Sequence, residues 1–306
     1  GRHGSPIRNG ANCCVSEDGR QWTVIKGEQT EENSLRLPVQ LPESGRLYVA
    51  RIEPYRLSDA ERLLAEIGSQ ADVLIQDIGQ TVEGRRLEIV QIGRAGAAHS
   101  LLLRGRAHPW ETGGNWMLEG LIRRMLEVDD PSFCLYAMPI ANKDGVAHGG
   151  SRFNLMGKDL NRDWGVPADS GLAPENVALE QWLGGLERLP DLAIDFHNDS
   201  SGKIHVSRPE GAYETYWAHM ELLEKVMRDH TWFTEGSTGS SFKNAGTFGE
   251  GLLMRYGIDA CIMELNCNWS AGLNKAPLAE DWILMGQQMY DAFCAYFEAS
   301  RNNGVI

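Results

Sequence analysis

Residues 191–199 read DLAIDFHND, an apolar run that ends in polar residues. A continuous apolar run of this length is typical of a strand that is buried on both faces of a sheet. The run delivers His197 into a polar loop, and the carboxyl ends of strands are where α/β sheets place their binding and catalytic groups. The stretch therefore predicts an α/β fold with a functional site at the end of this strand.

Other apolar runs alternate with helical stretches from Val73 onward, which is typical of a sheet with helices packed on its faces. The predicted strands are 87–92, 100–103, 133–138, 192–196 and 260–265. The predicted helices are 113–125, 175–186, 213–227 and 278–297. A capping-box pattern, Ser58 to Glu61, predicts that one more helix begins at this point.

The first 55 residues differ from the rest in composition. They are rich in Gly, Ser, Asn and Glu and contain two short β-prone pieces, at 21–25 and 46–51. A chain of 306 residues is long enough for one large domain with a small module attached. We therefore expect a small β-rich appendage over residues 1–55 and a catalytic domain over residues 56–306.

Charge and apolar content limit the partners of this chain. A formal net charge of -13 argues against a nucleic-acid surface, because phosphate contacts need clustered Lys and Arg. No run approaches the roughly 18 apolar residues that cross a bilayer. We expect neither a nucleic acid nor a membrane as partner.

The six cysteines show no spacing suited to a metal site, and adjacent residues such as Cys13 and Cys14 rarely bridge each other. Reduced thiols and a cytoplasmic location are therefore favoured. Secretion stays open, because the chain begins with Gly1 and a signal sequence is removed from a mature secreted protein.

Three residues have the chemistry of a zinc site. His108 and Glu111 are three apart where a predicted strand turns into a helix, so their side chains face the same side. Alone, such a pair also arises by chance on a solvated surface, and a lone histidine such as His197 is often structural. Together, the three supply the ligands of a hydrolytic zinc site, with a fourth position open for water.

Two further motifs contain charged residues that would suit the predicted zinc site. Two arginines and an amide, Arg152, Asn161 and Arg162, suit an anionic substrate group, since guanidinium binds carboxylate through two parallel hydrogen bonds. Glu264 lies inside an apolar strand, where a carboxylate needs a partner or a chemical role. Alternatively, the first motif is an ordinary charged surface loop, and Glu264 forms a structural salt bridge.

Taken in order, these motifs resemble those of the zinc metallocarboxypeptidases of the carboxypeptidase A type, and most closely the cytosolic carboxypeptidase branch. The matching pieces are AHPWET at 107–112, NKDGV at 142–146, DLNR at 159–162, Phe196-His197 and Met263-Glu264. Trp110 and Lys143 depart from the family pattern, and neither change removes a ligand. The resemblance implies a mixed, largely parallel central sheet with helices on both faces.

The resemblance also implies a zinc-dependent hydrolase that removes the C-terminal residue of a peptide or protein. It assigns one Zn²⁺ per chain to His108, Glu111 and His197. It makes Glu264 the general base that takes a proton from the zinc-activated water and returns it to the leaving amine.

The remaining roles follow from the same resemblance. Asn161 and Arg162 bind the terminal carboxylate of the substrate, and Arg152, preferred to Arg106, also contacts the substrate and stabilises the oxyanion. Asp159 orients the first zinc histidine, although a turn cap is an alternative for this residue.

The same residues are also compatible with two other functions. A zinc amidohydrolase of small N-acyl amino acids, similar to aspartoacylase, shares the metal and the base. A catalytically silent zinc or peptide-binding module is the second alternative, and the presence of every metal ligand together with Glu264 argues against it.

Overall fold

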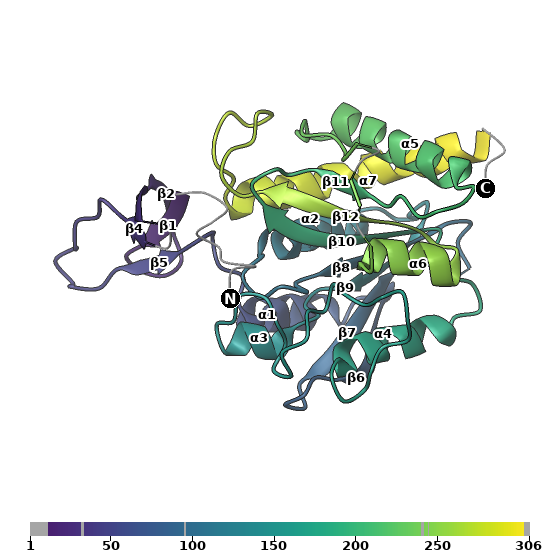
Figure 1. The fold of residues 1–306 in the computed structure, drawn as a ribbon, viewed down its shortest axis with the longest axis horizontal. Coiled ribbons are helices and arrows are strands. Elements are labelled where there is room, and N and C mark those ends of the chain that lie inside the picture. Colours follow the sequence, from purple (N-terminus) through teal and green to yellow (C-terminus); the bar gives the residue numbers. More distant parts are fainter. Residues whose placement is uncertain (1–11, 32–33, 95, 240–241, 244, 303–306) are drawn as a thin grey trace.

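The central element of the fold is a seven-stranded sheet (Figure 1). The computed structural model describes residues 12–31, 34–94, 96–239, 242–243 and 245–302. The strand order is β11-β12-β10-β8-β9-β7-β6. The bounds of these strands are β6 Val73–Gln80, β7 Arg86–Ile92, β8 Ser100–Gly105, β9 Cys134–Met138, β10 Leu192–Asp199, β11 Ile204–Val206 and β12 Asp259–Asn266.

The four central strands, β12, β10, β8 and β9, are parallel, whereas β11 and β7 run antiparallel to their neighbours. Parallel strands at the middle of a sheet are covered on both faces, and this explains their continuous apolar runs. The prediction of a mixed, largely parallel α/β sheet is confirmed.

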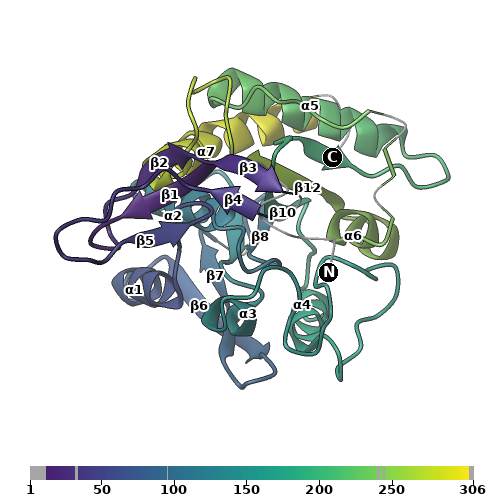
Figure 2. The same cartoon turned by 60° about the vertical axis from the view of Figure 1, so that its left-hand side comes forward.

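Helices cover both faces of this sheet (Figures 1 and 2). Their bounds are α1 Leu57–Ile67, α2 Gly113–Leu126, α3 Lys143–Ala147, α4 Pro174–Gly184, α5 Glu214–His230, α6 Phe248–Tyr256 and α7 Ala279–Asn302. A hydrophobic core lies on each face of the sheet. Leu101 and Leu103 of β8 pack with α2, α5 and α7 in one core, whereas Leu102 packs with α4 and α6 in the other. None of the helices in the described part of the chain is long and apolar enough to span a bilayer.

The described residues between 12 and 50 contain two small antiparallel sheets at one end of the molecule (Figure 1). One has the order β2-β1-β5, and the other pairs β3 with β4. The bounds are β1 Asn12–Ser16, β2 Thr23–Lys26, β3 Glu28–Glu31, β4 Ser34–Arg36 and β5 Tyr48–Ala50. The division of the chain at residue 55 stays a prediction.

The start of α1 differs from the prediction. The helix begins one residue earlier than Ser58, because the Asp59 carboxylate accepts the backbone N–H of Arg56 at 2.7 Å and so fixes Arg56 as the capping residue. The predicted piece 46–51 forms only the three residues of β5, and the predicted piece 21–25 is shifted to Thr23–Lys26. The expected strands and long helices are otherwise present within a few residues of their predicted ends.

Two glycines allow α2 and α7 to approach closely. A Cβ atom on Gly120 would lie 2.1 Å from Ile283 O, and one on Gly286 would lie 1.9 Å from Met117 O. Backbone oxygens of a helix cannot move aside as a flexible side chain does. The contact therefore requires glycine at both positions.

Gly120→Ala should lower the free energy of unfolding by about 1–3 kcal/mol, because the added methyl group forces the two helices apart. Urea denaturation followed by circular dichroism measures the change. Gly184→Ala is the matched control, since it lies at the exposed end of α4 with no atom within 4 Å of the added Cβ. Equal effects of the two substitutions would contradict the packing argument.

Candidate metal centre

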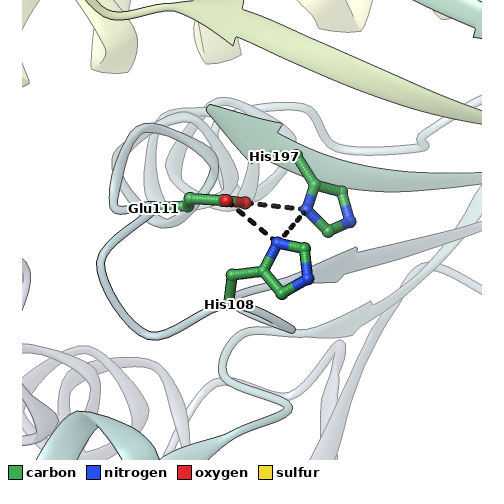
Figure 3. Close-up of side chains that lie close together, drawn as sticks. All are labelled: His108, Glu111 and His197. Atoms are coloured by element: carbon green, nitrogen blue, oxygen red, sulfur yellow. Dashed lines mark hydrogen bonds and ion pairs between the residues drawn. The ribbon is translucent and has the colours of Figure 1, made fainter. Parts of the chain in front are cut away.

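Three buried side chains meet at the carboxyl end of the central strands (Figure 3). His108 Nδ1 lies 2.9 Å from Glu111 Oε1, and His197 Nδ1 lies 2.7 Å from Glu111 Oε2. The two Nδ1 atoms are 3.1 Å apart. The structure thus brings together the three residues that the sequence predicts as zinc ligands.

The outer nitrogen of each histidine contacts a buried carboxylate. His108 Nε2 lies 3.0 Å from Asp159 Oδ1, and His197 Nε2 lies 2.8 Å from Asp195 Oδ2. An ionised carboxylate only accepts hydrogen bonds, so each Nε2 carries a proton and each Nδ1 is left for a second proton or for a cation. Paired carboxylates of this kind orient metal-binding histidines in general.

The charges of the cluster favour a cation at its centre. Burial raises the pKa of Glu111, but the two histidines outweigh this effect and lower it to about 2. Burial also opposes a charge on His197, yet Asp195 and Glu111 raise its pKa well above the ordinary value. Positive charge is therefore stabilised at His197 Nδ1, and a Zn²⁺ ion held by His108, Glu111 and His197 would supply it, since this metal prefers imidazole and carboxylate donors. The residues fit the metal.

A tight turn after β8 presents His108 and Glu111. Arg106 adopts a left-handed backbone conformation, with φ of 63°, and its guanidinium donates to the carbonyls of Tyr55 and Pro109. It also donates to Asn115 in α2. Arg106 is buried and its contacts lie within the protein, so it holds the turn.

The beginning of α2 packs directly against the end of β10. A Cβ atom on Gly114 would lie 2.5 Å from the Phe196 side chain, and the N–H of Gly113 donates to Asn198 Oδ1 at 2.9 Å. This close approach brings the turn that carries Glu111 to the strand that carries His197.

A buried ion pair that the sequence patterns did not predict holds the third histidine in place. Arg104 of β8 donates through Nε to Asp195 Oδ1 at 2.9 Å, and both side chains are buried. The Arg104 guanidinium lies 5.0 Å from the ring centroid of Trp164 and 4.4 Å from that of Phe248. The sequence signal for this pair is a charged residue within each of two apolar strands, Arg104 near the end of β8 and Asp195 in the middle of β10.

Glu264 lies next to His197, because the two residues are partners in the parallel register of β10 and β12. Its Oε2 atom is shielded from solvent and has no hydrogen-bond partner among the described residues. Burial is the main cause that raises the pKa of Glu264 well above the ordinary value; Asp199 and Glu111 raise it further, and His197 opposes them. An unpartnered carboxyl group beside a metal centre suits proton transfer.

The residues predicted to bind substrate lie around the cluster. Arg152 donates through Nε to Asp159 Oδ2 at 2.7 Å. Arg162 is exposed and donates to its neighbour's carbonyl, Asn161 O. Asn161 is buried, with Oδ1 accepting the N–H of Phe248 and Nδ2 lying 3.2 Å from a ring nitrogen of His197. Its substrate-binding role stays a prediction.

Comparisons with known proteins agree with this geometry. Residues 62–200 match the zinc carboxypeptidase family. Cytosolic carboxypeptidase 6 of Caenorhabditis elegans is 31% identical over 225 residues, which cover 63% of this chain and 47% of the relative. An uncharacterized protein of Zymomonas mobilis is 27% identical over 195 residues, which cover 61% of this chain and 49% of the relative. The chain spans about half the length of these two curated relatives.

Solved structures share the fold. The metallo-carboxypeptidase from Burkholderia cenocepacia superimposes with a TM-score of 0.82 at 22% identity, covering 96% of this chain and 82% of that chain. The metallo-carboxypeptidase from Pseudomonas aeruginosa in complex with (2-guanidinoethylmercapto)succinic acid gives the same TM-score and identity, covering 95% and 81%. At this level of identity the likeness shows the fold alone.

Asp159→Asn should weaken zinc binding by about 10- to 100-fold, because a neutral amide replaces the charged acceptor of His108 Nε2. Competition with a chromophoric chelator measures the affinity. Asp163→Asn is the matched control, since Asp163 is exposed and pairs with Lys158. Unchanged affinity in the first variant would show that Asp159 does not support the metal.

Proposed function

We propose that this chain belongs to the zinc carboxypeptidase family, whose model matches residues 62–200, and that it is a metallocarboxypeptidase, which hydrolyses the C-terminal peptide bond of a peptide or protein. The observation that carries the proposal is the converging cluster of His108, Glu111 and His197 with Glu264 beside it in register. A cytoplasmic location is part of the proposal and is supported by the names of the cytosolic relatives.

One Zn²⁺ per chain would be held by His108, Glu111 and His197. Zinc supplies a Lewis acid that polarises the scissile carbonyl and lowers the pKa of water. Asp159 and Asp195 keep the outer nitrogens of the two histidines protonated and fix the orientation of the rings.

Glu264 is proposed as the general base. Its carboxylate takes a proton from the attacking water as the water oxygen bonds to the carbonyl carbon. The same carboxyl group then gives that proton to the leaving nitrogen as the C–N bond breaks. One water is consumed, and a free amino acid and a shortened chain result.

Two arginines are proposed to bind the charges of the substrate. Arg162 is exposed and therefore free to reach a terminal carboxylate, with Asn161 beside it. Arg152 contacts Asp159, so it lies near the metal ligands, where the oxyanion of the tetrahedral intermediate forms.

Mass spectrometry of a mixed peptide library tests the activity. The zinc-loaded protein should remove single C-terminal residues, and a chelator-treated sample should not. Absence of shortening would overturn the carboxypeptidase proposal. Hydrolysis of small N-acyl amino acids by the same sample would then identify a deacylase, and zinc binding without any hydrolysis would identify a silent binding module.

Glu264→Gln should lower kcat by about 100- to 10,000-fold, because the amide cannot accept the proton from water. The library assay gives the rate, and the chelator competition should show that zinc stays bound. Activity near that of the unmodified chain would remove Glu264 from the role of base.

Arg162→Ala should raise KM for peptides with a free C-terminal carboxylate and leave the slow cleavage of amidated peptides almost unchanged. The reason is that only the free peptides offer the carboxylate that guanidinium binds. Arg94→Ala, an exposed arginine paired with Asp130, is the control. Equal losses on both kinds of peptide would mean that Arg162 does not bind the carboxylate.

A further inference from the structure

Asp199 and His205 form a polar pair beside Glu264, apart from the three proposed metal ligands. One carboxylate oxygen or ring nitrogen from each of Asp199, His205 and Glu264 lies within 4.8 Å of those of the other two. Their strands β10, β11 and β12 are neighbours in the sheet (Figure 1). His205 is the partner of Ile262, which lies two residues before Glu264 on β12, so both side chains share one face. The pair therefore lies next to the bond that the proposed enzyme cleaves.

The Asp199 carboxylate is held in place by the loop that follows β10. Oδ1 accepts the N–H groups of Ser201 and Gly202, both at 2.7 Å, and Oδ2 accepts the hydroxyl of Ser201 at 2.7 Å. A carboxylate offers about four acceptor positions, so one is left for a ligand. Within the part of the chain that the structure describes, no Lys or Arg side chain forms an ion pair with Asp199.

His205 is partly buried and also lacks a polar partner. Its ring packs on that of Phe242, with 4.6 Å between the centroids, and its nitrogens form no hydrogen bond to a described residue. Burial lowers the pKa of His205 to about 4, so the ring is neutral near pH 7 and one nitrogen can accept a hydrogen bond. An unpartnered nitrogen in such a place is unfavourable unless a ligand joins it.

The charges around the pair favour a positively charged ligand group. An acidic side chain at this place would lie against two carboxylates, those of Asp199 and Glu264, which repel it. An ammonium or guanidinium group can donate to a carboxylate and to a neutral imidazole at the same time. Lys203, the residue before β11, is exposed and forms no ion pair with a described carboxylate, so it does not supply this group.

The proposed binding site for the terminal carboxylate lies around the same histidine. Asn161 Nδ2 is 3.2 Å from Nε2 of His197, and His197 is the register partner of Glu264. The carboxylate and the side chain of the last residue of a substrate leave the same Cα atom. When Asn161 and Arg162 bind the carboxylate, the side chain of that residue is the part that reaches Asp199 and His205. Lys and Arg carry their charge at the end of a long apolar stem.

We propose that Asp199 and His205 bind the positively charged side chain of the C-terminal residue, so that the enzyme prefers substrates that end in Lys or Arg. This inference names the substrate class of the proposed metallocarboxypeptidase and rests on that function. Asp199 accepts a hydrogen bond from the ammonium or guanidinium group, and His205 accepts another. Both residues determine specificity and take no part in proton transfer.

Cleavage of peptides that differ only in the last residue tests the preference. Values of kcat/KM should fall in the order Lys, norleucine, Glu. Norleucine has the four-carbon stem of lysine without the ammonium group, so the comparison isolates the charge. The step from Lys to norleucine should be about 10-fold or more, the size expected for a hydrogen bond to a charged group.

Asp199→Asn should lower kcat/KM for the Lys peptide by about 10- to 100-fold and leave the norleucine peptide almost unchanged. The amide oxygen can still accept the N–H groups of Ser201 and Gly202, so the loop should keep its conformation. Zinc affinity, measured by chelator competition, should also stay unchanged, which separates lost recognition from damage to the metal centre. Asp130→Asn, a change at an exposed carboxylate that pairs with Arg94, is the matched control.

His205→Phe provides a second variant. It keeps a ring against Phe242 and removes the acceptor nitrogen, so it should lower kcat/KM for the Lys peptide by about 10-fold with little effect on the norleucine peptide. Thermal melting shows whether each variant is folded, and Asp199→Asn alone decides the question if His205→Phe is not.

The outcomes separate this inference from the proposed function. Cleavage of the Lys, norleucine and Glu peptides at similar rates, or fastest cleavage of the Glu peptide, would overturn the preference and leave the carboxypeptidase standing. A preference for Lys that survives in Asp199→Asn would show that other residues bind the charge. No cleavage of any peptide by the zinc-loaded chain would overturn both.

Discussion

The ion pair between Arg104 and Asp195 is the contact on which the arrangement of the metal centre depends. Both side chains are buried, and removal of one charge from such a pair typically costs about 3–5 kcal/mol, because the other is left without a partner. The second partner of Asp195 is His197 Nε2. A charge pair inside the sheet therefore sets the orientation of the ring that faces Glu111.

The register of β10 with its two neighbouring strands places the other groups of the site relative to this ion pair. Asp195 pairs with Arg104 on one side, and two residues later His197 pairs with Glu264 on the other. Side chains two apart point to the same face, so the ion pair, the third ligand and the proposed base share that face. A slip of one residue in either pairing would turn these groups to the opposite side and would separate them.

The sequence predicted the parts of the molecule that local patterns encode. Continuous apolar runs located the central strands, and the spacing of His108 and Glu111 at the end of one of them located the metal site. Arg104 and Asp195 were not predicted as partners, because each lies alone in an apolar strand and only the register joins them. The cap at Arg56 was not predicted for a different reason: the Asp59 side chain, and not the expected Ser58, makes the capping contact.

The acidic surroundings of Glu264 determine how a metal ion changes its chemistry. Burial is the main cause that raises the pKa of Glu264, and Asp199, Glu111 and Asp195 raise it further, so positive charge placed among these carboxylates lowers it. A cation on the three metal ligands acts through space and moves Glu264 toward the ionised form that accepts a proton. The same excess of carboxylates that keeps Glu264 protonated thus makes its readiness as a base depend on a metal ion at the three ligands.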